Sequence, residues 1–482
     1  MNVSGYQSDN STLIADRQLS GAVPALGVLA LLSPILLLTF DWGLPLVACY
    51  LGALAAVMLL VSPTIAYLVF LASISVFLPY RLSLFWIHPF DVVFALTLGA
   101  TVLDFLLRGR TLVRASGYDL VFALLILATL VSALFAYDIR LSVIPSLRII
   151  CVYLAFRLAF LYGLKIGVRR LLLFYLVQAS LLSIVAFVQF ALLGGQVRFF
   201  GITGLALQYF AMTALPMALA FLVWSESRLA RTAYGLMSIA CGLGIFATQS
   251  RAPFVAVVIA VPVLLVVAYR KSSREGTVRI TRVVKQVLAP VLLLAGGLLI
   301  MEESLFVNTL GRIEELIASI NEPQGTVARR LVLWLAAFKA FLANPVTGIG
   351  IGNMRLVHQV VPEIRLEPLW YLVKGMSAHN VLLHYLAETG LLGTAALVAL
   401  FVKGLRTGWR AFKTRSSSVD SQVSAALFMA MFVCFLTMLY MRAWTWGQGG
   451  YILALLFGLN AAWNSSRTTV GDQNRSDRSS TG

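Results

Sequence analysis

Apolar residues occur along this chain in runs of about 20, separated by short polar or basic segments. A run of about that length lets an α-helix cross a hydrocarbon core roughly 30 Å thick, whereas a membrane β-strand shows only about 10 residues of alternating polarity. The pattern therefore predicts an all-α, polytopic membrane protein. Fourteen runs are candidate transmembrane helices, at residues 21–40, 43–61, 63–79, 90–107, 119–136, 143–163, 171–193, 205–224, 233–248, 253–269, 286–301, 380–402, 424–441 and 448–463. Because only Ser62 and Pro63 separate the second run from the third, twelve to fourteen helices is the expected range.

The composition supports this fold class. Hydrophobic residues make up 60% of the 482 residues and charged residues 12%, and the mean hydropathy is +0.89. These values exclude a soluble globular protein and a disordered one. The four cysteines all lie inside apolar runs, which indicates small core residues rather than a disulfide framework. They are Cys49, Cys151, Cys241 and Cys434.

The net charge of +17 is spread over several gaps between apolar runs. It does not gather on one soluble face, so it does not indicate a nucleic-acid partner. The positive-inside rule places such basic clusters in the cytoplasm, where they can also contact anionic membrane lipid. With both chain ends in the cytoplasm, all five clusters fall on that side without skipping a helix. The clusters are residues 108–114, 165–170, 225–231, 269–285 and 403–415.

This topology divides the chain into four parts. Residues 1–301 would hold helices 1–11 with short loops, residues 302–378 one large external loop, and residues 379–463 the last three helices. Residues 464–482 are rich in Ser, Thr, Asn and Arg and predict a disordered cytoplasmic tail. The first apolar run lacks a convincing small-residue cleavage site, so we expect a retained helix rather than a signal peptide.

The large external loop is expected to have structure and a function of its own, because structureless loops of this length are uncommon. The stretch RRLVLWLAAFKAFLANP predicts a helix that Asn344 and Pro345 end. Trp334, Phe338 and Phe341 would share one face of that helix, which suits a helix lying along the membrane interface.

A glycine-rich stretch, GIGIGN, follows this helix at residues 348–353. It resembles half of a dinucleotide-binding fingerprint, but that fingerprint follows a strand, whereas this stretch follows a predicted helix. It would also lie outside the cell, where nucleotides are scarce. We therefore interpret it as a flexible turn that connects two parts of the loop.

The candidate chemistry lies at the external boundary. His379 precedes an apolar helix, and a neutral imidazole there can take a proton from a hydroxyl group. Arg251 and Arg330 are expected on the same side, and a guanidinium group can hold a phosphate through two parallel hydrogen bonds. Arg198 is a third external arginine. The alternative is that His379 is a structural residue at a helix start and that the arginines are anchors reaching the lipid headgroups.

Two further polar residues follow within the same helix. His384 and Glu388 are four residues apart on one face, and a structural polar pair is favoured over a catalytic role. Glu388 is nonetheless an acid inside a membrane helix, which is rare. Asn380 is expected to cap the helix.

Metal and nucleotide cofactors are not expected. The four histidines, which include His88 and His358, are scattered along the chain. No external group of His, Asp and Glu has the spacing of metal ligands, and neither a phosphate-binding loop nor a nucleophile elbow is present.

The pattern His379, Asn380, nine residues, Gly390, two residues, Gly393, Thr394 resembles the signature of the bacterial O-antigen ligase and O-antigen polymerase superfamily. The resemblance extends upstream through TQSR (248–251), RLVLW (330–334) and NPVTGIGIGN (344–353), so it covers about residues 195–400. The first 190 residues match only as generic membrane helices.

The resemblance implies a glycosyltransferase in the bacterial inner membrane with its active site facing the periplasm. Such an enzyme moves a glycan from an undecaprenyl-diphosphate donor to an acceptor hydroxyl and needs neither metal nor nucleotide. The residues at the positions of His379, Arg251 and Arg330 are essential in that family. Two extra candidate helices and a basic tail depart from its usual twelve-helix plan.

Three functions remain open from the sequence. A ligase would transfer the glycan to a lipid A core sugar, and a polymerase would transfer it to another lipid-linked glycan; the signature favours the ligase because it matches without a gap. A transporter of lipid-linked glycans should carry a polar path and inverted repeats. Intramembrane charges are few and no repeat is visible, so transport is the least favoured. The clearest such charges are Asp104, Arg148, Arg157 and Glu388.

Overall fold

The computed structural model describes residues 62–75, 88–108, 115–192, 206–248, 250–275, 284–285, 325–414, 417–440 and 447–466. Within these ranges the chain forms helices and turns and no β-strand, which confirms the all-α fold class. The predicted helices at 21–40, 43–61 and 286–301, the tail after Ser466 and Arg198 lie outside the described residues. The last helix continues through Ser465, two residues into the predicted tail.

Residues 1–109 form one compact unit. Its described helices are α3 (Pro63–Ser73) and α4 (Pro89–Arg108), which correspond to the third and fourth predicted runs. The Thr97 hydroxyl donates to the Ala66 carbonyl oxygen at 3.1 Å and joins the two helices.

Residues 110–482 form the second unit. Each of its long apolar helices corresponds to a predicted run. They are α5 (Asp119–Leu134), α6 (Ile139–Tyr162), α7 (Val168–Leu192), α8 (Ala206–Val223), α9 (Arg228–Ala247), α10 (Arg251–Glu275), α16 (Val381–Thr414), α17 (Ser418–Met438) and α18 (Gly447–Ser465). A π-helical segment, η1 (Gly163–Gly167), joins α6 to α7, and Gly167 ends it with a φ of 100°.

Six helical stretches in the described part of the chain are long and apolar enough to cross a membrane. They are Phe90–Leu107, Ile139–Leu192, Arg228–Ala247, Pro253–Lys271, Val381–Thr414 and Ser418–Met438. The chain is therefore a multi-pass membrane protein.

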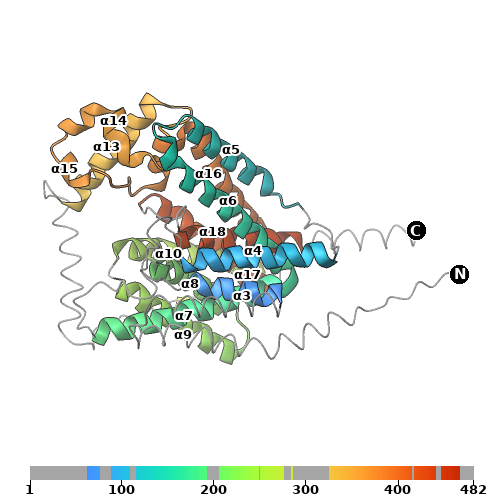
Figure 1. Cartoon of the computed structure of the whole chain (residues 1–482). Coiled ribbons are helices and arrows are strands. Elements are labelled where there is room, and N and C mark those ends of the chain that lie inside the picture. The colour runs from blue at the N-terminus through green and yellow to red at the C-terminus, as the bar shows by residue number, and fades with distance from the viewer. Residues whose placement is uncertain are drawn as a thin grey trace. The chain divides into compact units, whose positions relative to one another are not determined.

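Helix α8 is the central helix of the second unit. It packs against α7, α9, α10 and α17 (Figure 1). Every residue from Leu207 to Trp224 is buried. A helix that is apolar on all sides is suited to such a position.

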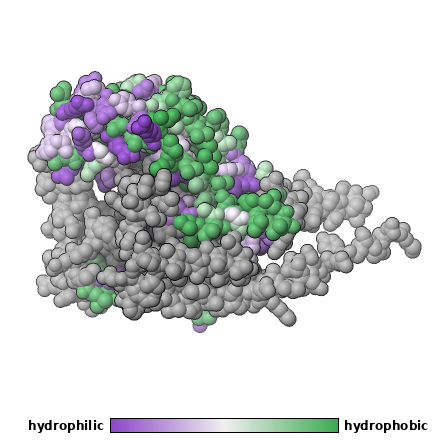
Figure 2. All heavy atoms as spheres, in the orientation of Figure 1, coloured by the Kyte–Doolittle hydropathy of each residue, from purple (hydrophilic) through white to green (hydrophobic). Residues whose placement is uncertain are grey.

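Helix α5, in contrast, presents a stripe of leucines on its surface. Hydrophobic residues gather over this helix, and hydrophilic ones gather over the neighbouring α13, α14 and α15 (Figure 2). A continuous apolar stripe of this kind suits contact with lipid acyl chains. The exposed leucines are Leu120, Leu124, Leu127, Leu130 and Leu134.

The basic clusters adjoin residues that meet at one end of the second unit. The Lys403 ammonium donates to the Gly117 carbonyl oxygen, and the Lys271 ammonium donates to the Phe412 carbonyl oxygen at 3.2 Å and the Ser421 hydroxyl at 2.7 Å. Described residues of the clusters at 269–285 and 403–415 thus contact each other, and Lys403 also contacts Gly117, which lies a few residues after the cluster at 108–114 in the sequence. This contact is compatible with the prediction that these clusters share one side of the membrane.

Residues 325–378, which belong to the loop predicted to be external, fold into short helices. They are α13 (Thr326–Ala343), η2 (Met354–Leu356), α14 (Val357–Val360), η3 (Pro362–Leu366) and α15 (Trp370–Val373). Helix α13 confirms the predicted loop helix and ends at Asn344 as expected.

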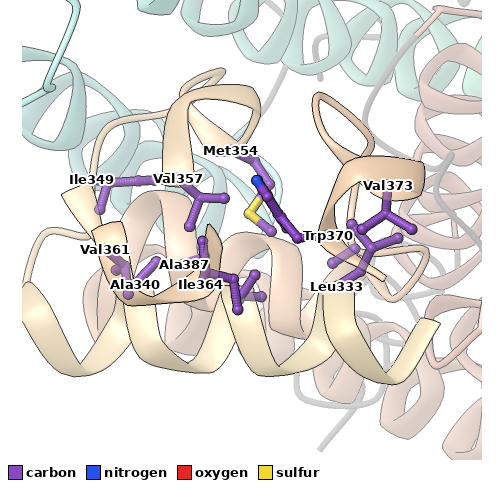
Figure 3. Close-up of a cluster of buried hydrophobic side chains, with 13 residues drawn as sticks. Leu333, Ala340, Ile349, Met354, Val357, Val361, Ile364, Trp370, Val373 and Ala387 are labelled. Carbon is purple, nitrogen blue, oxygen red and sulfur yellow. The ribbon is translucent and has the colours of Figure 1, made fainter. Parts of the chain in front are cut away.

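These short helices share a hydrophobic core (Figure 3). Helix α13 contributes small and branched residues, α14 and η3 contribute Val357, Val361 and Ile364, and the Trp370 ring lies among them. Ala387 of α16 belongs to the same cluster, so the loop is packed directly onto a membrane helix.

The three aromatic residues predicted on one face of α13 differ in burial, and the rings of Phe338 and Phe341 lie 6.1 Å apart. The buried face consists of Leu333, Ala336, Ala337 and Ala340. Trp334 packs against this core, whereas the Phe338 side chain is 46% exposed. The indole ring turns inward because its N–H reaches a backbone carbonyl group of the loop, as described below.

Candidate functional site

Helix α16 is broken near its start. Gly390 has φ 60° and ψ −157°, which no α-helix contains, so the helix predicted at 380–402 is in fact two helical segments meeting at this glycine. A break of this kind leaves backbone N–H and C=O groups without their helical partners.

A loop segment supplies those partners. Residues 345–353, here called the docked segment, follow α13 and lie against the break. Backbone N–H groups of the docked segment donate to carbonyl oxygens before the break, and its own carbonyl oxygens accept from N–H groups after it. The bonds join Ile349 to Ala387 at 2.9 Å, Gly350 to Glu388 at 3.0 Å and Leu391 to Pro345 at 2.9 Å.

The interpretation of GIGIGN as a flexible turn is corrected by this arrangement. Residues 348–353 are all buried. Gly348, Gly350 and Gly352 have φ values of 70°, 99° and 83°, a region that glycine enters readily. A Cβ atom on Gly348 would lie 2.3 Å from the Glu388 carbonyl carbon, and one on Gly350 would lie 2.2 Å from the Ala136 Cβ atom. The glycines therefore allow close backbone contact rather than flexibility.

Polar side chains of α5 and α6 hold the other side of the docked segment. The Ser132 hydroxyl donates to the Glu388 carbonyl oxygen at 2.7 Å and accepts from the Ile351 N–H at 3.1 Å. The Asn353 side chain accepts from the Asp138 N–H at 3.0 Å and donates to the Ser142 hydroxyl at 3.0 Å. Three helices are thus tied to one loop.

His384 and Glu388 form the predicted polar pair. Nε2 of His384 lies 3.3 Å from Oε2 of Glu388, and the Glu388 side chain is almost fully buried. Oε1 of Glu388 accepts from the Met354 N–H at 3.0 Å, directly after the docked segment. The pair therefore also fixes the loop to α16.

His379 has an unusual backbone conformation. Its φ is 50°, and it is the one residue other than glycine with a positive φ among the described residues. Such a conformation costs an L-residue about 1–2 kcal/mol and persists only where the surroundings impose it. Strain of this kind concentrates at functional sites.

The residues on both sides of His379 are fixed. The Asn380 side chain accepts from the Leu383 N–H at 3.0 Å, which confirms the predicted cap. The Trp334 indole N–H donates to the Ala378 carbonyl oxygen at 2.9 Å. Because Arg330 lies one turn before Trp334 on the same face of α13, its side chain starts from the surface that faces His379.

The structure describes the three predicted arginines in different detail. Arg330 is partly buried in α13. Arg251 is the first residue of α10, about 30 Å along the helix from Lys271, which lies at the basic end. Arg251 therefore begins α10 at the end of the bundle away from the basic clusters. Arg198 lies outside the described residues, as do the contacts of the Arg251 side chain.

The described residues therefore include one basic side chain, that of His379, on a backbone that hydrogen bonds hold in place. Arg330 supplies a positive charge on the helix that packs against this backbone. A histidine can remove a proton, and an arginine on the helix face that packs toward Ala378 can bind an anion. In the part of the chain that the structure describes, no group of three His, Cys, Asp or Glu residues comes together as metal ligands.

Sequence reasoning missed several residues that support the site. Ser132 and Ser142 contact the docked segment across more than 200 residues of sequence. Nothing in their local pattern distinguishes them from other serines in membrane helices. The glycines and Asn353 of GIGIGN were the available signal, because closely spaced glycines indicate tight backbone packing as well as turns.

The family model described as O-Antigen ligase matches residues 236–398, which include α9, α10, α13, the docked segment and the broken start of α16. A search of curated proteins found no match to the chain. The matched region agrees with the resemblance found in the sequence, and it contains His379, Arg251 and Arg330. This match supports membership of the O-antigen ligase superfamily and indicates a ligase-like or polymerase-like membrane enzyme.

Proposed function

We propose that the protein transfers a glycan from an undecaprenyl-diphosphate donor to an acceptor hydroxyl at the periplasmic face of the bacterial inner membrane. The observation that carries this proposal is the strained His379, held between the Trp334 bond to Ala378 and the Asn380 cap. It lies at the end of the bundle away from the basic clusters, which the positive-inside rule assigns to the cytoplasm.

The proposed reaction is a direct displacement. Neutral His379 takes the proton of the acceptor hydroxyl while that oxygen forms a bond to the anomeric carbon of the donor sugar. The bond between this carbon and the diphosphate oxygen breaks, and the anomeric configuration inverts. The lipid diphosphate leaves as an anion, which Arg251 and Arg330 stabilise through charge-assisted hydrogen bonds.

A donor that is anchored in the lipid explains the location of the site. The loop core and the docked segment hold His379 at the first turn of a membrane helix, where a lipid-linked diphosphate would present its sugar. The acceptor that we favour is a lipid A core sugar, as in a ligase. Another lipid-linked glycan would be the acceptor of a polymerase.

The test uses purified full-length protein in detergent with a lipid-linked donor and acceptor. We expect transfer by the wild type, and a loss of about 10²–10⁴-fold in His379→Ala, the usual contribution of general-base catalysis. Arg330→Lys keeps the positive charge but loses the planar fork, so it should also be impaired. Wild-type transfer by His379→Ala would remove the proposed base, and no transfer by folded wild type would favour a transporter.

Gene deletion separates the two acceptors. Loss of a ligase leaves long polymers on the carrier lipid, whereas loss of a polymerase leaves single repeat units. Single units would therefore contradict the proposed acceptor and leave the proposed chemistry intact.

A further inference from the structure

Helix α13 runs beside the first part of α16. Next to the start of α16, the Trp334 indole N–H donates to the Ala378 carbonyl oxygen at 2.9 Å. Directly after α13, the Pro345 carbonyl oxygen accepts from the Leu391 N–H at 2.9 Å. Between these two contacts the two segments cover similar distances, about 16 Å and about 20 Å at 1.5 Å per helical residue. The two helices therefore advance side by side in the same direction.

This part of α16 belongs to a helix that is long and apolar enough to cross a membrane, Val381–Thr414. Leu391 is about ten residues, or roughly 15 Å, into that helix, which is half the thickness of a hydrocarbon core of about 30 Å. A segment that shares this depth needs an apolar outer surface and a backbone whose polar groups all have partners.

Helix α13 has an exposed apolar stripe on the side opposite to its buried face. The stripe residues follow i, i+4, i+7, i+11 spacing, which places them within about 60° around the helix axis. They are 36–59% exposed. The residues of the stripe are Leu331, Leu335, Phe338 and Leu342.

The stripe adjoins exposed leucines of α16. Val346 of the docked segment is exposed, and its carbonyl oxygen accepts from the Leu392 N–H at 3.4 Å. Leu391 and Leu392 are themselves half-exposed. Because exposed leucines of a membrane helix face acyl chains, we expect the adjoining stripe to have the same surroundings.

The backbone of the docked segment also fits this depth. Non-helical backbone is tolerated inside a membrane only where protein covers it and its polar groups are bonded. Residues 348–353 are buried. The N–H groups of Ile349 and Gly350 donate to α16, and that of Ile351 donates to the Ser132 hydroxyl.

We propose that α13 is embedded in the membrane beside the first part of α16, with its apolar stripe in contact with lipid acyl chains. The helix then follows α16 into the membrane, which differs from the orientation along the interface that the sequence suggested. Embedding does not depend on glycan transfer. One consequence rests on the proposed function: Arg330 lies on the flank between the stripe and the buried face, where a lipid-linked diphosphate would reach it from the bilayer.

The test replaces Phe338 with photoreactive benzoylphenylalanine in full-length protein reconstituted in phospholipid nanodiscs. Irradiation links this side chain to nearby C–H groups, and mass spectrometry identifies the partner. We expect a lipid adduct in a yield similar to that from Leu124, which is 50% exposed in the leucine stripe of α5. The yield should be several-fold above that from Leu366 of η3, which is 85% exposed. Helix η3 packs on the buried face of α13, away from the stripe.

A lipid yield at Phe338 no higher than at Leu366 would overturn the proposal, because water would then surround the stripe. Adducts with a second copy of the chain, or within the same chain, in place of lipid would overturn it too. Leu342 is the most exposed residue of the stripe and repeats the test if the first variant does not fold. Glycan transfer is measured separately with the wild type. A lipid adduct without wild-type transfer refutes the proposed function alone, whereas transfer without an adduct refutes the embedding of α13 alone.

Discussion

The two parts of α16 on either side of Gly390 are stabilised in different ways. The short part before the break, Val381–Thr389, is held by hydrogen bonds to the docked segment and to Ser132. The long part after it packs through small residues. A Cβ atom on Gly404 would lie 2.2 Å from the Met431 methyl carbon, and one on Gly408 would lie 3.3 Å from the Phe428 Cα atom.

This difference separates the candidate site from its scaffold. The long part resembles other membrane helix interfaces, where small residues permit close packing and side chains adjust around them. The short part depends on specific backbone positions, because each bond joins one named N–H to one named oxygen. A site that must hold His379 within a fraction of an ångström benefits from this second kind of support.

The largest effect is expected from a methyl group in the docked segment. In Gly348→Ala the new Cβ atom would lie 2.3 Å from the Glu388 carbonyl carbon, and backbone atoms cannot move aside cheaply. We expect a loss of transfer activity and a destabilisation of about 3 kcal/mol or more, measured by thermal unfolding in detergent.

Gly375 provides the control for that variant. Its φ of 81° is close to that of Gly348, but nothing lies within 4 Å of a Cβ atom placed there. Gly375→Ala should therefore cost only the backbone strain of about 1–2 kcal/mol and retain activity. Equal damage from both variants would show that conformation, rather than contact with Glu388, decides the effect.

The same difference explains how much the sequence predicts. Hydrophobic runs predicted all the long helices among the described residues. The thickness of the hydrocarbon core sets the length of an apolar run, and that length is directly visible in the sequence. The loop helix and the Asn380 cap were also predictable from local signals. His379 and its neighbouring glycines were recognised as a motif.

The break in α16 was not predictable in this way. Gly390 in an apolar helix is ordinary, and its φ of 60° depends on the docked segment that occupies the break. Contacts such as Asn353 to Asp138 join residues far apart in the sequence, and no periodicity encodes them. The inward turn of Trp334 likewise depends on a distant carbonyl group, that of Ala378.

An intermediate effect is expected in the long part of α16. In Gly404→Ala the new methyl group meets the Met431 side chain, which can bend, and the Phe457 ring, which can shift less. Overpacking of this kind costs about 1–3 kcal/mol. We expect a thermal midpoint lower by several degrees and an unchanged kcat in the folded protein, because His379 keeps its supports.

Gly235 in α9 is the matched control for Gly404. It is helical, and nothing lies within 4 Å of a Cβ atom placed there. Gly235→Ala should be neutral or should stabilise the helix by up to about 1 kcal/mol. A fall in kcat for Gly404→Ala without a change in stability would contradict the separation between scaffold and site.

The smallest effect concerns the response of the loop core to pH. His358 packs against Trp370, and burial together with the positive charges of Lys374 and Arg365 lowers the pKa of its imidazole below the usual value. The unfolded chain therefore takes up a proton more readily than the folded chain, and folding stability falls as pH drops through the unfolded pKa of about 6.5. Above that pH the imidazole is neutral in both the folded and the unfolded chain, and its contribution to stability vanishes.

The variant His358→Gln removes this proton uptake. It should therefore lose less thermal stability than the wild type between pH 7.5 and pH 5.5, because the other titrating groups affect both proteins alike. Equal losses in the two proteins would show that the charge on His358 has no influence on the loop core.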